Sequence, residues 1–329
     1  MRDRNVDVLL EGVRSGDRAA LGRAITLIES TREADRSTAQ DLLGALLPRS
    51  EGALRVGITG VPGVGKSTFI EVLGGRILED DERRVAVLAV DPTSTRSGGS
   101  ILGDKTRMRR LAGDPRVFIR PSPSGPIAGG VARRTREALL VCEAAGYDTI
   151  FVETVGVGQA ETAVHGMVDY FLLLVLAGAG DELQGIKRGI VEMADGIAVT
   201  KAEGDNQAAA EAARRAFQSA LQLFPPMPSG WEPPVHTCSA MTGAGLDEIW
   251  ESILEYERQT RSSGYFEARR RQQARNWLHE TLDERLIAAL HADPDVSDVL
   301  ADYEARVING ELTAAAAADA ILAAYRRLP

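Results

Sequence analysis

The stretch GVPGVGKS, residues 60–67, constrains the fold of this 329-residue chain more than any other feature. It matches the pattern G-x-x-x-x-G-K-[ST] at every fixed position, follows the apolar run LRVGIT and precedes the helix-forming run STFIEVLGGRIL. Glycines in such a turn let backbone N–H groups point inward around phosphate oxygens, and the N-terminus of the following helix adds its positive dipole end. The alternative is a glycine-rich turn with an incidental lysine, and the strand and helix on either side argue against it. The sequence therefore predicts a phosphate-binding loop between a strand and a helix.

From residue 53 to about 259, apolar runs typical of strands alternate with helical patterns. The seven runs are LRVGIT, RVAVLAV, RVFIR, DTIFVE, DYFLLLVLA, DGIAVT and PVHTCS. Continuous apolar strands between helices indicate a mostly parallel sheet that is covered on both faces. We therefore predict an α/β fold, a P-loop NTPase with a doubly wound, mostly parallel sheet and with N-terminal and C-terminal helical extensions.

Helical segments flank this core on both sides. Residues 1–52 carry short amphipathic patterns, with Asp17 placed as the N-cap of LGRAITLIE. No strand pattern occurs after residue 260. We predict three domains: an N-terminal helical segment (1–52), a nucleotide-binding domain (53–259) and a C-terminal helical arm (260–329). The arm is expected to be apolar on one face with no sheet to cover, which indicates a homodimer interface; the apolar residues are Trp277, Leu278, Leu282, Leu286 and Ile287.

Composition and charge exclude several classes of protein. A net charge of −9 argues against a nucleic-acid partner, because dedicated nucleic-acid binders carry a basic excess. The basic cluster of Arg269, Arg270, Arg271 and Arg275 lies among acids on a predicted helix, and we interpret it as a solvated or interface face. No apolar run is long enough to span a bilayer, so no membrane partner is expected. The two cysteines stand far apart in no metal or redox spacing, which favours the reducing cytoplasm.

Acidic residues close two of the predicted strands. Asp91 ends RVAVLAVD and Glu153 ends DTIFVE, at the carboxyl edge where open α/β sheets bind ligands. Magnesium bound together with phosphates takes one or two carboxylates or hydroxyls and keeps several waters. A helix cap or a turn is the alternative role for each acid. The predicted metal ligands are Ser67, Asp91, Asp104 and Glu153, and Lys66 is expected to reach the β- and γ-phosphates.

The residue that orients a catalytic water is less well defined. Gly156 takes the place of the glycine that senses the γ-phosphate in common GTPases, but Val157 follows it where small signalling GTPases carry glutamine. Gln159 lies nearby, and a structural hydrogen-bonding role fits it equally well. Because the sequence identifies no internal arginine finger, intrinsic hydrolysis should be slow, on the order of 10⁻⁴ to 10⁻² s⁻¹. The predicted catalytic residues are Lys66, Asp91, Glu153 and Gln159.

Two further segments indicate which base is bound. Thr200 opens T-K-A-E, in which the stem of Lys201 can lie on a base face while Glu203 accepts the N1–H and N2–H₂ donors of guanine. Ser239-Ala240, after the last predicted strand, is placed to bind guanine O6 through a backbone N–H. The alternative is that Glu203 caps the following helix. GTP or GDP with Mg²⁺ is the expected ligand, and the predicted contacts are Gly60, Val61, Pro62, Gly63, Val64, Gly65, Lys66, Ser67, Thr68, Lys201, Glu203, Ser239, Ala240 and Met241.

With these residues in place, the chain resembles the MeaB/ArgK-type GTPases, partners of adenosylcobalamin-dependent methylmalonyl-CoA mutase. The likeness covers nearly the whole chain and rests on GVPGVGKSTFIE, AVDPTSTRSGGSILGDKTRM, FIRPSPSG, FVETVGVGQAE and GDELQGIKRG. It implies a homodimeric GTPase that gates cofactor loading and protects or rescues the mutase, with the C-terminal helices as a dimerisation arm. It also implies phosphate and magnesium roles for Lys66, Ser67, Asp91, Asp104 and Glu153, and a partner-responsive switch around Asp181, Gln184 and Lys187.

The chain departs from the family pattern at two places. Glu203 stands where the family carries Asp, and RPSPSGPIAGG replaces the more typical RPSPSSGTLGG. The first bears on nucleotide affinity and the second on the partner, because a relative serving isobutyryl- or hydroxyisobutyryl-CoA mutase would look much the same. No D-x-H-x-x-G motif is present, so cobalamin is expected to belong to the partner.

Two other functions compete with this one. The first is an ATP-dependent kinase associated with lysine, arginine and ornithine transport, although nothing resembles a kinase catalytic loop. The second is a targeting GTPase with a methionine-rich signal-binding domain, and the chain has only six methionines.

Overall fold

The computed structural model describes residues 2–30, 32–47, 52–90, 108–121, 128–154, 160–177 and 188–325. The chain forms two compact units, Met1–Arg271 and Gln272–Pro329. Within the described ranges, no helix is long and apolar enough to cross a membrane.

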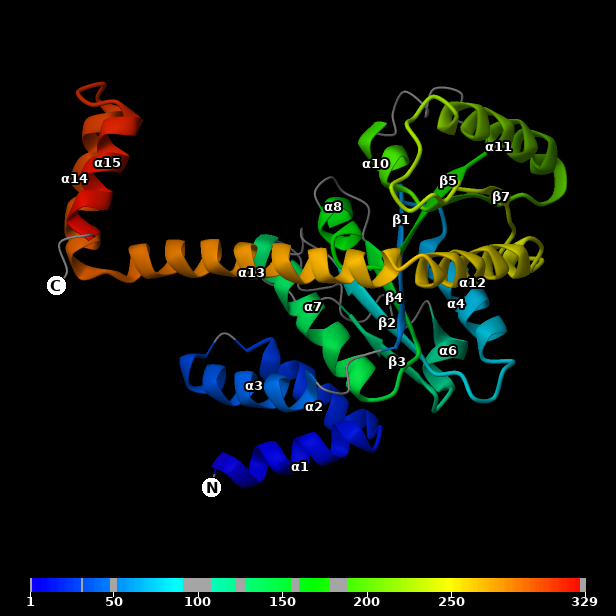
Figure 1. Ribbon diagram of the computed structural model, residues 1–329, viewed down its shortest axis with the longest axis horizontal. Coiled ribbons are helices and arrows are strands. Elements are labelled where there is room, and N and C mark those ends of the chain that lie inside the picture. The colour runs from blue at the N-terminus through cyan, green and yellow to red at the C-terminus, as the bar shows by residue number, and fades with distance from the viewer. Residues whose placement is uncertain are drawn as a thin grey trace. The chain divides into compact units, whose positions relative to one another are not determined.

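A seven-stranded parallel sheet forms the centre of the first unit (Figure 1). Its strand order is β3-β2-β4-β1-β5-β6-β7, and every pairing is parallel. This confirms the predicted doubly wound α/β fold. The strands are β1 (Leu54–Gly60), β2 (Val85–Val90), β3 (Val117–Arg120), β4 (Thr149–Thr154), β5 (Tyr170–Leu176), β6 (Gly196–Thr200) and β7 (Val235–Thr237).

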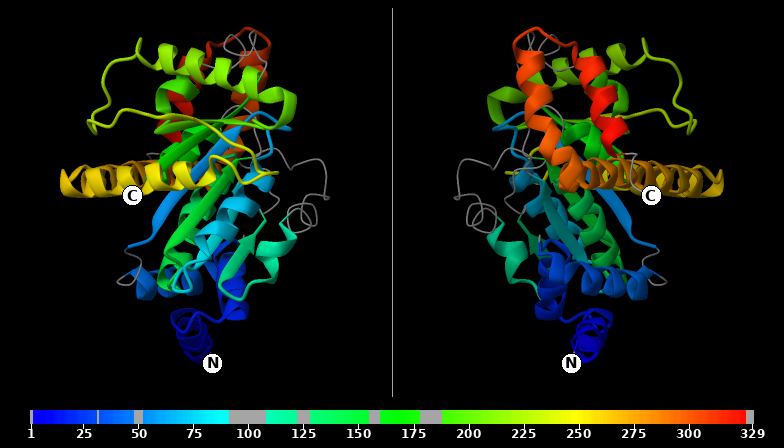
Figure 2. Two further views of the ribbon diagram at one scale, coloured as in Figure 1. Left: turned by 90° about the vertical axis from the view of Figure 1, so that its right-hand side faces the viewer. Right: turned by 90° about the vertical axis from the view of Figure 1, so that its left-hand side faces the viewer.

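Helices cover both faces of the sheet (Figure 2). One face packs against α4 (Lys66–Ile77), α6 (Arg109–Gly113) and α12 (Leu246–Ser262). The other packs against α7 (Ala128–Ala144) and α8 (Ala160–His165), while α10 (Arg188–Met193) and α11 (Gln207–Leu221) share a core with β5, β6 and β7. Every residue of β2 and β4 is buried, which is why β2 is continuously apolar and why β4 has the apolar centre Ile150–Val152.

The N-terminal helices belong to the same core. They are α1 (Arg2–Arg14), α2 (Arg18–Ile28) and α3 (Glu33–Leu46), and their buried residues Leu21, Ile25 and Leu42 join the cluster that contains α7. Asp17 caps α2 as predicted, because its Oδ1 accepts the N–H groups of Ala19 and Ala20 at 2.7 and 2.9 Å.

Arginine side chains tie the start of α13 (Tyr265–Ala292) to the amino ends of two strands. Arg270 donates to Asp169, just before β5, at 2.8 and 2.6 Å. Arg269 donates to Asp195, just before β6, at 3.3 Å and to the hydroxyl of Tyr256 at 2.9 Å. Only 11% and 19% of the Arg269 and Arg270 side chains are exposed, so of the two predicted roles, a solvated or an interface face, the solvated one is wrong for these residues. Helical spacing among acids could not reveal carboxylates that lie 74 and 101 residues away.

The described residues of the second unit form helices joined by short turns. It contains most of α13, then α14 (Pro294–Ile308) and α15 (Ala314–Tyr325), with Asp293 as the N-cap of α14. Large apolar side chains of α13 are exposed, but they do not form the predicted single face. At roughly 100° per residue, Leu278, Leu282 and Leu286 share one side, whereas Ile287 lies opposite Leu278. The exposed fractions of these four side chains run from 46% to 58%.

Candidate nucleotide site

The phosphate-binding loop joins β1 to α4 through two glycines that no other residue can replace without strain. Gly60 has φ 153°, and a Cβ there would lie 2.4 Å from the carbonyl oxygen of Leu174 on β5. Gly65 has φ 99° and occupies the N-cap position of α4. The first N–H groups of a helix have no partner within it, so this turn presents backbone donors and a positive dipole end at the carboxyl edge of the sheet.

Lys66 lies over this loop. Its Nζ donates to the carbonyl oxygens of Gly60 and Val61 at 2.8 and 3.3 Å, and the residue is only 8% exposed. Burial lowers the pKa of Lys66, and the negative charges of Glu153 and Glu161 partly offset that shift. The lysine is therefore held where a phosphate would complete its hydrogen bonding.

Ser67 and Glu153, two of the four predicted metal ligands, are in direct contact. The Ser67 hydroxyl donates to Oε1 of Glu153 at 2.9 Å, and both residues are buried. Strand register places Glu153 of β4 beside Ile58 on β1 and Ala89 on β2, and the loop after β1 leads to α4, which carries Ser67. Among the residues that the structure describes, no three His, Cys, Asp or Glu side chains cluster as a metal site.

Several predicted site residues lie outside the described residues. They are Asp91, Asp104 and Gln159, together with Asp181, Gln184 and Lys187 of the predicted partner-responsive switch.

The segment after β6 is tied to the phosphate loop. Thr200 Oγ1 donates to the carbonyl oxygen of Val64 at 2.9 Å, and Lys201 Nζ donates to that of Gly63 at the same distance. Lys201 has φ 58°, and in the described part of the chain it is the one non-glycine residue with a positive φ. The predicted base-binding and phosphate-binding segments thus form one continuous surface.

Glu203 does not cap a helix. It precedes the short 3-10 helix η2 (Gly204–Asn206), yet its side chain makes no capping hydrogen bond, so the capping alternative is wrong. Its Oε2 is buried and accepts no hydrogen bond from any described residue. Burial, reinforced by the carboxylate of Glu203, raises the pKa of the neighbouring Cys238 thiol to about 12. A buried carboxylate oxygen without a donor is costly, and a ligand with N–H groups would satisfy it.

The Ser239-Ala240 turn is closed by its own hydrogen bonds. The N–H of Ser239 donates to the carbonyl oxygen of Ala244 at 2.9 Å, and its Oγ accepts the N–H of Thr242 at 3.1 Å. A bond of 3.0 Å from the N–H of Ala202 to the carbonyl oxygen of Cys238 joins this turn to the Lys201–Glu203 segment. No described residue accepts the N–H of Ala240. Met241, a predicted contact, is 84% exposed.

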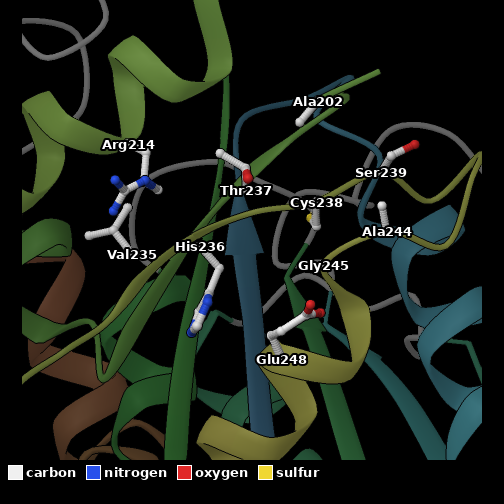
Figure 3. Close-up of a pocket in the computed structure, with 10 residues that line it drawn as sticks. All are labelled: Ala202, Arg214, Val235, His236, Thr237, Cys238, Ser239, Ala244, Gly245 and Glu248. Carbon is white, nitrogen blue, oxygen red and sulfur yellow. The ribbon is translucent and has the colours of Figure 1, made fainter. Parts of the chain in front are cut away.

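A cavity of about 350 Å³ adjoins these two base-side segments (Figure 3). Arg214 of α11, His236 of β7 and Glu248 of α12 line this cavity. Ala202 and Ser239, which belong to the two base-side segments, also line it. Burial lowers the pKa of His236, an effect that Glu248 opposes and Arg214 reinforces. The turn that carries Ala240 therefore borders this cavity through Ser239 and Ala244.

Three residues of this region were not predicted from the sequence. Thr200 anchors the phosphate loop, Glu161 is 5% exposed and acts on the pKa of Lys66, and Asn206 Nδ2 donates to the carbonyl oxygen of Lys201 at 2.7 Å. The signal available for Asn206 was its place in the turn-forming run E-G-D-N.

Comparisons with known proteins identify the family. The model of the family described as methylmalonyl Co-A mutase-associated GTPase MeaB matches residues 21–295. A probable GTPase of Mycobacterium tuberculosis is 53% identical over 320 residues, which cover 97% of this chain and 95% of that protein. The GTPase ArgK of Escherichia coli is 46% identical and covers 86% of this chain and 85% of its own length.

Two further relatives extend the match to a mitochondrial protein and to a solved structure. The mitochondrial methylmalonic aciduria type A homolog of Mus musculus is 44% identical, covering 98% of this chain and 80% of that protein. A crystal structure titled as an LAO/AO transport system kinase superposes with a TM-score of 0.78 at 36% identity and covers 99% of both chains. Because the family model spans most of the chain and these relatives match it over nearly their full lengths, the chain belongs to the MeaB family of GTPases, the family associated with methylmalonyl-CoA mutase.

Proposed function

We propose that this GTPase is a chaperone of a B12-dependent acyl-CoA mutase, methylmalonyl-CoA mutase or a close relative. It binds and hydrolyses GTP, gates cofactor loading and protects the mutase. The observation that carries the nucleotide part is the Oε2 of Glu203, which is buried with no hydrogen-bond partner among the described residues and follows a lysine bonded to the phosphate loop. The family match supports the partner.

Guanine rather than adenine fits the base side. The carboxylate of Glu203 accepts the N1–H and N2–H₂ groups of guanine together, and the N–H of Ala240 is available for O6. Adenine would place an acceptor against the same buried carboxylate, which leaves both groups unpaired. This chemistry disfavours the ATP-dependent transport kinase, the second function considered.

Lys66 and Ser67 serve the phosphates. Two carbonyl oxygens occupy two of the three N–H donors of Lys66, so one donor remains to reach a β- or γ-phosphate. Ser67 and Glu153 provide hard oxygen ligands at the start of α4, a donor set that fits Mg²⁺ or its bound water. When bound, the ion neutralises charge that develops on the phosphate oxygens. Asp91 and Asp104 complete the proposed ligand set.

We also propose that the protein is a homodimer joined through its arm. Four large apolar side chains of α13 are about half exposed, on more than one side of the helix. Leu278, Leu282 and Leu286 share one side of this mostly polar helix, and a second copy of the arm would bury them.

The function is tested with the purified protein and methylmalonyl-CoA mutase from the same host. We expect the mutase to raise GTP turnover, and transfer of adenosylcobalamin to the mutase to depend on GTP. Lys66→Ala should lower turnover by at least about 10²-fold, because it removes a donor aimed at developing charge, with an unchanged circular dichroism spectrum. GTP turnover that is unchanged by the mutase, together with adenosylcobalamin transfer that is unchanged by GTP, would contradict the chaperone role.

A further inference from the structure

We propose that Asn206 is a positioning residue for base recognition, because its side chain holds Lys201 in the left-handed backbone conformation that sets Lys201 and Glu203 against the base. The inference rests on the proposed guanine site. It assigns a role to a residue outside the predicted base contacts, which is joined to two of them, Lys201 and Glu203, by one hydrogen bond each.

The backbone at Lys201 is unfavourable and must be held by its surroundings. A φ of 58° places Lys201 in the left-handed region, where the Cβ of an L-residue crowds the backbone. Lysine gains nothing from that region, unlike glycine or asparagine. Non-glycine residues persist there when neighbouring contacts over-determine the conformation, and such residues gather at functional sites.

Asn206 supplies two of those contacts. Its Nδ2 donates to the carbonyl oxygen of Lys201 at 2.7 Å, and its backbone N–H donates to the carbonyl oxygen of Glu203 at 3.1 Å. The orientation of the amide is fixed by chemistry, because only the nitrogen end can donate to a carbonyl oxygen. Asn206 therefore closes the turn at both ends, with Glu203 enclosed between them.

Asn206 does not play the helix-capping role that asparagine usually has before a helix. Asn206 is the N-cap residue of α11, but its side chain makes no capping bond to that helix. Its φ of −84° and ψ of −8° are helical, whereas a capping residue adopts an extended backbone. The amide is directed back to Lys201 instead of forward to α11.

The backbone conformation of Lys201 sets how the base-side segment is attached to its two neighbours. Lys201 Nζ bonds to the carbonyl oxygen of Gly63, and the N–H of the next residue, Ala202, bonds to that of Cys238 beside the Ser239-Ala240 turn. If Lys201 relaxes to an extended backbone, the directions of its stem and of Glu203 change together. The loss should fall on the base and spare the phosphates.

The experiment compares GDP and inorganic tripolyphosphate binding to the full chain. Asn206→Ala removes the donor, and Asn206→Asp places an acceptor against the Lys201 carbonyl oxygen. We expect the Kd for fluorescent mant-GDP to rise about tenfold in Asn206→Ala, the scale of one hydrogen bond, and further in Asn206→Asp. The Kd for tripolyphosphate should change by less than about twofold, since the phosphate loop is intact. Gln207→Ala, an exposed neighbour, is the matched control and should bind both like wild type.

Repeating the measurement in a Lys201→Gly protein distinguishes a positioning role of Asn206 from a general destabilisation of the turn. Lys201→Gly weakens GDP binding by itself, but glycine adopts positive φ without strain. Adding Asn206→Ala to Lys201→Gly should therefore cost GDP affinity less than about twofold. The same tenfold loss in both backgrounds, or wild-type GDP affinity in both Asn206 variants, overturns the inference. A wild-type protein without preference for GTP over ATP would instead defeat the proposed function, so the two failures are distinguishable.

Discussion

At the scale of single residues, we propose that the longer side chain of Glu203 sets the strength of discrimination between guanine and adenine. Its Oε2 is buried without a described donor, so the carboxylate is available to guanine. Well-formed sites reject a wrong partner by about 10⁴–10⁵, and the extra methylene should reduce that figure without reversing the preference. We predict that Glu203→Asp binds GTP at least as tightly as wild type and that Glu203→Ala loses most of the GTP-over-ATP preference. Competition binding of both nucleotides checks this, and an alanine variant as selective as wild type would contradict it.

His165, at the end of α8, gives the stability of the fold a specific pH dependence. Burial, helped by the positive charge of Arg269, lowers the pKa of His165 to about 4. In the unfolded chain it titrates near 6.5, so between about pH 6.5 and 4 the unfolded state binds more protons. The contribution of His165 to the free energy of unfolding is therefore fully present above about pH 6.5. It is lost as the pH falls toward 4, and the loss is about 3 kcal/mol at most.

The comparison of wild type with His165→Gln isolates this contribution. Urea unfolding at pH 7.5 and 4.5 should show the wild type losing more free energy of unfolding than the variant. His291→Gln, at an exposed position of α13, is the control and should follow wild type. Parallel pH profiles for wild type and His165→Gln would rule the prediction out.

At the scale of elements, the junction between β7 and α12 controls the turn that carries Ala240. Gly245 opens α12 with φ 76°, and a Cβ there would lie 2.1 Å from the carbonyl oxygen of Thr237. We predict that Gly245→Ala pushes α12 away from β7, destabilises the fold by about 1–3 kcal/mol and weakens GTP binding. Gly264→Ala is the matched control, because Gly264 has φ 75° but nothing within 4 Å of its Cβ position. Urea unfolding and GTP titration should show a clearly larger loss at Gly245, and equal losses would contradict the clash.

The same scale separates what the sequence could predict from what it could not. The strands were predictable because they are buried on both faces and therefore carry apolar runs, such as VAVLAV in β2 and IFV in β4. The phosphate loop was predictable because its residues are contiguous. Arg269, by contrast, pairs with Asp195 across 74 residues, and Thr200 bonds to Val64 across 136, so no local pattern contains either contact. Excluding a capping bond by Glu203 needed coordinates, because capping and base recognition place the same residue at the same point of the sequence.

At the scale of the whole molecule, the candidate nucleotide site and the start of α13 lie at opposite ends of the strands. The nucleotide-side residues lie at the carboxyl ends of the strands, around Ser67 and Lys201. The root of α13 is fixed at the amino ends of β5 and β6 through Asp169 and Asp195. A conformational change at the nucleotide would therefore reach the root of α13 only across the sheet, along its strands or through helices such as α8. The positive charge of Arg269 already lowers the pKa of His165 at the end of α8.

The final prediction concerns the association of two chains. Leu282 and Leu286 lie one turn apart on α13, are 46% and 58% exposed, and belong to the proposed dimer interface. Replacing both with Glu introduces two charges that a buried interface cannot solvate, so we expect the variant to be monomeric. Light scattering should give a mass near 35.3 kDa, against twice that mass for wild type. Ser297→Glu with Ala301→Glu, an equally spaced exposed pair on α14, controls for added charge and should remain dimeric. The first unit contains the whole described nucleotide site, so GTP affinity should be unchanged in both variants. A wild-type protein that is monomeric at micromolar concentration, or a Leu282/Leu286 variant that stays dimeric, would exclude α13 as the dimer contact.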